Sequence, residues 1–213
     1  MNINKIACVG AGLIGSGWAT LFLSKGYKLT LQDINKNILD TAVNIIRTNL
    51  IFHKKNNLLK LDSIEEAIKR IKITTSIEEA VSGADYIQES VPDDLALKHK
   101  VFKEIDNKAL DQAIIASSAS GLLMTDIQKA AGRPGRCVMV HPILPVHLIP
   151  LVEIGGGPDT LPESLEIADN FMKQLGKTTV VLKKEVPGYI VNRLQSAVLR
   201  EAMDLVDKGI ATA

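Results

Sequence analysis

Short apolar runs alternate with amphipathic segments along most of the chain. The runs KIACV (5–9), QAIIASS (112–118) and RCVMVH (136–141) are bounded by polar residues or glycine, which is typical of buried strands. The segment 94–107 instead repeats its apolar residues at helical spacing. Strands that alternate with helices predict a mainly parallel, doubly wound sheet with helices on both faces, a Rossmann-like α/β fold.

The same pattern predicts further strands and marks the ends of several helices. Ser63 and Ser76 each precede a glutamate by three residues, which is the spacing of a capping box. Pro162 near its start and Gly176 at its end bracket another helix. The remaining predicted strands are KLTLQD (28–33), a short segment around 71–74, ADYIQES (84–90), PLVEI (150–154) and TTVVL (178–182).

The pattern changes after the last predicted strand. KKEVPG (183–188) has the composition of a linker, and the segment 189–209 forms one amphipathic helix that ends at Gly209. We therefore expect a Rossmann-like domain over residues 1–185. We expect residues 186–213 to be the first helix of an incomplete, all-α C-terminal domain.

Composition narrows the class of protein. Of 213 residues, 46% are hydrophobic and 23% are charged, and the net charge of +1 favours neither nucleic acid nor an acidic membrane as a partner. No stretch approaches the roughly 20 apolar residues of a membrane helix. Cys8 and Cys137 lie far apart and outside any CxxC motif, so we expect no disulfide framework and a cytoplasmic location.

A glycine-rich turn, GAGLIG (10–15), joins the first predicted strand to a helix. Gly10 permits the tight turn, Gly12 lets the backbone approach a pyrophosphate, and Gly15 allows close packing of helix against strand. The free N–H groups and the dipole of the helix N-terminus favour an anion at this position. The turn therefore predicts a dinucleotide-binding site, to which Leu13 and Ile14 also belong.

Asp33 indicates which dinucleotide this site prefers. It ends the second predicted strand, 18 residues after Gly15. An acidic side chain at that point binds both ribose hydroxyls and repels a 2′-phosphate, so NAD is preferred over NADP.

The segment HPILPVHLIPLVE (141–153) places two histidines and a glutamate within an apolar run. A hydroxyl that loses a hydride must also lose its proton, and histidine is the usual base because its pKa lies near neutrality. Glu153 would orient His141 if the residues between them form a loop joining two strands. The alternative is a zinc site formed by His141, His147 and Glu153, but hydride transfer needs no metal, and we expect none. His147 is better explained as a loop residue.

Several of these segments, in their order along the chain, resemble the 3-hydroxyacyl-CoA dehydrogenase family. The resemblance covers essentially the whole chain and rests on GAGLIGSGWATLF, IQESVPDDLALK, SSASGLL, HPILPVHLIPLVE and PGYIVNRL. It implies that His141 is the general base, that Glu153 is its partner, and that the full-length protein is a homodimer. It further implies that Ser120 and Asn192 bind the substrate oxygen, and that Ser118, Asp93 and Lys98 line the nicotinamide and its ribose.

The substrate class stays open at this point. Details of the motifs look closer to the branch that contains L-gulonate 3-dehydrogenase, lambda-crystallin and carnitine dehydrogenase, whose members act on small 3-hydroxy acids without CoA. Both branches usually carry an asparagine where this chain has Leu144. The cluster His53, Lys54, Lys55 and Lys60 is either a CoA phosphate contact or, as we favour, a solvated helix end. A cofactor-binding protein with little turnover is a further alternative.

Overall fold

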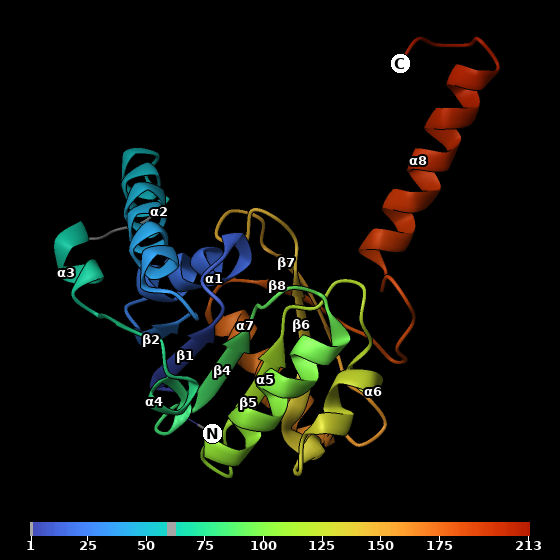
Figure 1. Cartoon of the computed structure of the whole chain (residues 1–213). Coiled ribbons are helices and arrows are strands. Elements are labelled where there is room, and N and C mark those ends of the chain that lie inside the picture. Colours follow the sequence, from blue (N-terminus) through green and yellow to red (C-terminus); the bar gives the residue numbers. More distant parts are fainter. Residues whose placement is uncertain (1, 59–62) are drawn as a thin grey trace.

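A computed structural model describes residues 2–58 and 63–213. Its centre is one eight-stranded sheet in the order β3-β2-β1-β4-β5-β6-β7-β8 (Figure 1). The strands are β1 (Lys5–Val9), β2 (Lys28–Gln32), β3 (Ile71–Thr74), β4 (Tyr86–Glu89), β5 (Ile114–Ser117), β6 (Cys137–Pro142), β7 (Leu151–Gly155) and β8 (Thr178–Val181). The expected doubly wound α/β fold is therefore confirmed.

Helices cover both faces of this sheet because its strands are apolar on both sides. In β1, Ile6 and Cys8 pack into one core, whereas Ala7 and Val9 pack into another. The first core is closed by α1 (Leu13–Ser24), α2 (Lys36–Lys55), α3 (Ile64–Ile68) and α7 (Pro162–Gln174). The second is closed by α4 (Ile77–Val81), α5 (Leu95–Lys108) and the short α6 (Met124–Ile127), with the 3-10 turns η1 (Gln128–Ala130) and η2 (Pro134–Arg136) following α6.

Local signals in the sequence explain several helix ends. The Ser63 hydroxyl accepts a hydrogen bond from the Glu66 amide, and the Ser76 hydroxyl accepts one from the Glu79 amide, so both expected N-caps form. α7 begins at Pro162, as predicted, and Gly176 adopts a φ of +83° just beyond its end. α6, η1 and η2 were not predicted, because each is too short to show a helical period.

The direction of the strands sets the position of the site. β1 to β6 run parallel, so the carboxyl ends of β1, β4, β5 and β6 meet at one edge of the sheet. β7 is antiparallel to β6, and β8 is parallel to β7. In open α/β sheets, ligands bind beyond the carboxyl ends of the parallel strands.

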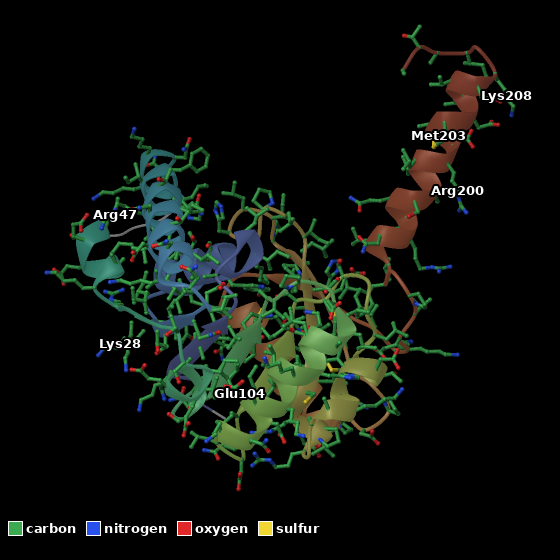
Figure 2. All side chains as sticks on the ribbon, viewed as in Figure 1. Lys28, Arg47, Glu104, Arg200, Met203 and Lys208 are labelled. Carbon is green, nitrogen blue, oxygen red and sulfur yellow. The ribbon has the colours of Figure 1, made fainter. Side chains whose placement is uncertain are left out.

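The last helix, α8 (Val191–Asp207), stands apart from this body (Figure 1). None of its residues is buried, and Arg200, Met203 and Lys208 lie well clear of the sheet in Figure 2. The linker before α8 is nevertheless held to the body, because Glu185 accepts hydrogen bonds from the Met124 and Thr125 amides. Within residues 2–58 and 63–213, no helix has the length and apolar character needed to cross a membrane.

Candidate active site

The glycine turn lies at the carboxyl end of β1 and adopts a shape that only glycine permits. Gly10 has a φ of +93°, and a Cβ there would meet the carbonyl group of Ser90 at 2.8 Å. A Cβ on Gly15 would meet the Gly10 oxygen at 1.8 Å. Both positions exclude any side chain, because backbone atoms cannot move aside. The missing side chain at Gly15 therefore lets the first turn of α1 approach Gly10, at the end of β1, closely.

Gly12 differs because a Cβ at this position would face open space. It is the N-cap of α1, and no side chain caps this helix end. The N–H groups of the first turn are thus left for an external acceptor. The turn therefore fits the diphosphate of a dinucleotide.

Asp33 closes the same end of the site from β2. Its Oδ2 accepts a hydrogen bond from the Ala11 amide at 2.7 Å, and its Oδ1 accepts one from the Ile34 amide at 2.7 Å. The carboxylate is therefore fixed against the glycine turn, where it can meet the ribose hydroxyls of a bound dinucleotide.

A cleft of about 590 Å³ extends from this turn along the edge of the sheet. Its volume lies within the range of small-molecule sites. Most of the cofactor-binding residues expected from the sequence line this cleft: Gly10, Gly12, Leu13, Ile14, Asp33, Asp93 and Ser118, together with Ser120.

Lys98 does not line the cleft, which corrects the position implied by the family resemblance. Its ammonium group is fully buried and lies 2.8 Å from Glu89 Oε1 and 3.4 Å from Asp93 Oδ1. Glu89 also accepts hydrogen bonds from the Ser117 hydroxyl and the Val91 amide. Burial raises the pKa of the Glu89 carboxyl, and the charge of Lys98 opposes that shift. Lys98 thus supports the loop after β4 from within the protein.

His141 and Glu153 lie directly opposite each other in the antiparallel β6–β7 pair. The His141 Nδ1 is 2.8 Å from Glu153 Oε2, and both side chains are buried. An ionised carboxylate only accepts hydrogen bonds, so Nδ1 carries the hydrogen and Nε2 is the basic nitrogen of the neutral ring. The register of the sheet thereby holds the His141 ring in one orientation.

Glu153 has a second role that the sequence did not reveal. Its Oε1 accepts hydrogen bonds from the Ile190 and Val191 amides, at 2.7 and 3.1 Å. These amides lie at the start of α8, where free N–H groups and the helix dipole attract an anion. One carboxylate therefore orients His141 and holds the beginning of α8.

Ser120 lies at the same edge of the sheet as His141 because β5 and β6 run parallel. β5 ends at Ser117, which pairs with Met139, and Ser120 follows β5 by three residues, whereas His141 follows Met139 by two. The Ser120 amide and hydroxyl both donate to Asp93 Oδ2, at 2.9 and 3.1 Å. The structure thus places Ser120 at the same edge of the sheet as His141.

Two further expected residues surround Ser120. The Asn192 side chain donates to the Ser120 carbonyl oxygen at 3.2 Å, which brings α8 to the same place. Burial alone would raise the pKa of Asp93, but hydrogen bonds from the Ser120 and Gly121 amides and the charge of Lys98 together hold it below its ordinary value. Asp93 is therefore an anchor that fixes the turn after β5.

His147 does not join His141 and Glu153. Its Nδ1 lies 2.8 Å from the His53 Nε2, and burial, His53 and Lys177 lower the pKa of His147 to about 4. Among residues 2–58 and 63–213, no three His, Cys, Asp or Glu side chains are grouped to hold a metal ion.

His53 also corrects the interpretation of the α2 end as wholly solvated. It is 4% exposed, whereas Lys54 and Lys55 are exposed. Lys60 lies outside the described residues. The contact between His53 and His147 joins positions 94 residues apart, so no local sequence pattern predicts it.

Lys177 is a residue that the sequence analysis missed. Its ammonium group donates to the carbonyl oxygens of Val146 and Ile149 in the loop between β6 and β7. Burial lowers its pKa to about 8. Lys177 therefore ties the loop that follows His141 to the body of the protein.

Comparison with known proteins places the whole arrangement in one family. Residues 5–186 match the model for the NAD binding domain of 3-hydroxyacyl-CoA dehydrogenase. The chain belongs to the 3-hydroxyacyl-CoA dehydrogenase family. It carries the family's NAD-binding domain, and the open Gly12 cradle and the fixed Asp33 are consistent with that cofactor.

Individual relatives agree with this assignment. An L-carnitine dehydrogenase from Streptomyces griseus is 42% identical over 99% of this chain and 62% of its own length. The human lambda-crystallin homolog is 37% identical over 97% of this chain and 65% of its own length. The crystal structure of (S)-3-hydroxybutyryl-CoA dehydrogenase from Ralstonia eutropha superposes with a TM-score of 0.91 and 28% identity, covering 99% of this chain and 74% of that one. The chain thus spans less than two thirds of the length of these first two relatives.

Asp33→Ala should weaken the discrimination between NAD and NADP. The variant loses the charged hydrogen-bond acceptor for the ribose and the charge that repels a 2′-phosphate. We expect affinity for NADH to fall about tenfold or more and the preference over NADPH to shrink by at least as much. Calorimetric titration with both dinucleotides measures the two changes. An unaltered preference would contradict the role of Asp33.

Proposed function

We propose that this protein is an NAD-dependent dehydrogenase that reversibly oxidises the 3-hydroxyl of a 3-hydroxy acid to a 3-keto group. The observation that carries the proposal is the buried His141–Glu153 pair, which lies at the same edge of the sheet as Ser118 and Ser120 of the cofactor cleft. A histidine whose Nδ1 is held by a carboxylate is suited to accept a proton at Nε2.

In this mechanism, His141 Nε2 removes the hydroxyl proton while Glu153 stabilises the imidazolium that forms. Ser120 and Asn192 bind the reacting oxygen, and Asp93 keeps Ser120 in place. NAD held at the glycine turn would supply the acceptor for the hydride that leaves carbon 3 of the substrate. In the reverse direction, the imidazolium returns its proton to the oxygen.

A free 3-hydroxy acid is the substrate class we favour. The two relatives described above are named L-carnitine dehydrogenase and lambda-crystallin homolog and are 42% and 37% identical to this chain, whereas the solved structure named (S)-3-hydroxybutyryl-CoA dehydrogenase is 28% identical. Leu144 lines the cleft with an apolar side chain. Lys54 and Lys55, on the exposed end of α2, are the described cations that would meet the phosphates of a CoA substrate.

A turnover panel distinguishes these substrates. With NAD present, we expect reduced nicotinamide to accumulate with carnitine, gulonate or 3-hydroxybutyrate, and much less with 3-hydroxybutyryl-CoA. Neutralising Lys54 and Lys55 together should leave the KM of a free acid unchanged and raise the KM of an acyl-CoA. Faster turnover of 3-hydroxybutyryl-CoA than of the free acids would show that the substrate is a CoA thioester. NADH binding without turnover on any substrate would favour a crystallin-like role.

We also propose a homodimer in a reducing compartment such as the cytoplasm. Cys8 and Cys137 are buried, free thiols, which suits such a compartment. The apolar side chains of α8 are exposed and offer a surface that a second copy would cover: Leu194, Val198, Leu199, Met203 and Val206, with Ile210 just beyond the helix. Sedimentation of the purified protein tests the oligomeric state.

A further inference from the structure

A chain of hydrogen bonds runs from the core of the protein to the cofactor cleft. The Tyr86 hydroxyl lies 2.9 Å from Gln88 Oε1, and Gln88 Nε2 lies 2.9 Å from the Ser118 hydroxyl. The Ser118 hydroxyl lies 2.9 Å from that of Ser90. Tyr86 and Gln88 are fully buried, whereas Ser90 and Ser118 line the cleft.

Trp18 limits the direction in which these hydrogen bonds can run at Ser118. Its indole Nε1 can only donate, and it lies 3.1 Å from the Ser118 oxygen. A hydroxyl oxygen has two lone pairs and one hydrogen. Trp18 and Gln88 occupy both lone pairs of Ser118, so the Ser118 hydrogen points to Ser90.

The orientation of the Gln88 amide is settled by Tyr86. If the amide were turned round, its NH₂ group would face the Tyr86 oxygen, and the buried Tyr86 hydrogen would have no recorded acceptor among the described residues. A buried donor without a partner costs about 1–3 kcal/mol, more than a lone pair left unused. Burial also raises the pKa of Tyr86, which keeps this hydrogen in place. The amide therefore donates to Ser118.

Since Ser90 accepts the hydrogen of Ser118, its own hydrogen is directed elsewhere. Its only recorded side-chain partner within the described part of the chain is Ser118. Ser90 follows β4 and borders the glycine turn, with its Cβ 3.7 Å from where a Gly15 Cβ would lie. An oxygen of a ligand bound at the turn is the acceptor that this position offers.

We propose that Ser90 is a cofactor-binding residue whose hydroxyl donates to an oxygen of the ribosyl diphosphate portion of NAD, in a direction set by Tyr86, Gln88, Trp18 and Ser118. Ser90 is thereby a donor of fixed polarity. The inference requires the dinucleotide site but is independent of the proposed oxidation, because its test measures binding alone.

Ser90→Ala should weaken binding of NADH and of ADP-ribose about tenfold each, the ratio expected for one hydrogen bond to a charged group. Calorimetric titration measures both ligands. Ser82→Ala, at an exposed serine that follows α4, is the matched control and should bind like the wild type. Unchanged ADP-ribose affinity in Ser90→Ala would overturn the proposal, whereas failure of the wild type to bind NADH would overturn the dinucleotide site itself.

Gln88→Glu tests the donor-to-acceptor direction of the hydrogen bonds from Tyr86 to Ser90. In its ionised form, a glutamate at position 88 accepts hydrogen bonds from both Tyr86 and Ser118, so Ser90 loses the bond from Ser118 that directs its own hydrogen to the cleft and can donate to Ser118 instead. We expect this substitution to weaken ADP-ribose binding more in the wild type than in the Ser90→Ala background, measured at a pH at which the new carboxyl group is ionised. Equal losses in both backgrounds would reveal only a charge or packing effect and would overturn the assigned polarity. Thermal unfolding of each variant verifies that it is folded.

Discussion

His141→Gln is expected to lower the turnover number about a thousandfold while leaving NADH affinity unchanged. The variant removes the only basic nitrogen at this position, and the loss of a positioned general base typically reduces rates by 10²- to 10⁴-fold. The glutamine retains an amide near Glu153, so the carboxylate is not left without a partner. Cofactor binding is expected to persist because Asp33 is held by the Ala11 amide of the glycine turn, whereas His141 is held by Glu153.

Initial rates with the best substrate of the panel and calorimetric NADH titration measure these two quantities. His99→Gln is the control, since His99 lies on α5 and its ring contacts the Asp126 carbonyl oxygen rather than the cleft. It should turn over like the wild type. Near-normal turnover in His141→Gln would show that another group removes the proton.

Lys98→Met is expected to lower the free energy of unfolding by about 3 kcal/mol at neutral pH. Lys98 and Glu89 are both fully buried and lie 2.8 Å apart. Removal of Lys98 leaves Glu89 with its hydrogen bonds from Ser117 and Val91 but without a counter-charge. A buried carboxylate in that state is costly, so the folded protein retains a proton on Glu89.

The pH dependence identifies this cause. Burial raises the pKa of Glu89 above its ordinary value of 4.5, and the loss of Lys98 raises it further. The stability that protonated Glu89 gives the variant is fully present below the pKa of Glu89 in the unfolded state. It is lost as pH rises through the pKa of Glu89 in the folded state. The difference in unfolding free energy from the wild type should therefore be small at acid pH and grow by up to about 1.4 kcal/mol per pH unit between these two pKa values.

Urea unfolding of both proteins at several pH values measures the difference. Lys103→Met provides the matched control, because Lys103 lies on the same helix and is exposed. Its effect should stay within about 0.5 kcal/mol. A loss in Lys98→Met that did not vary with pH would attribute the effect to packing rather than to the charge of Glu89.

Much of the fold follows from short-range patterns. The apolar runs, the capping boxes at Ser63 and Ser76, and the glycine turn each place their element within one or two residues of where the structure has it. These features depend on backbone sterics and on hydrogen bonds between residues close in sequence, so they can be predicted from the sequence alone.

Only part of the candidate site could be predicted from the sequence. The order of the motifs indicated His141, Glu153 and Ser120, and the structure brings these residues to one edge of the sheet. The family resemblance implied that Lys98 lines the cleft, and nothing in its motif indicates that the side chain instead pairs with Glu89 in the interior. His53 was grouped with surface lysines because its partner, His147, lies 94 residues away.

The sequence by itself determined the alternation of strands and helices, the glycine turn and the family. Only the tertiary structure decided which buried polar groups pair with one another, such as Lys98 with Glu89, and which side chains connect Tyr86 to Ser90. The physical reason is that local conformation depends on neighbouring residues, whereas the pairing of a buried charge or hydroxyl depends on which strands and helices enclose it once water has been excluded.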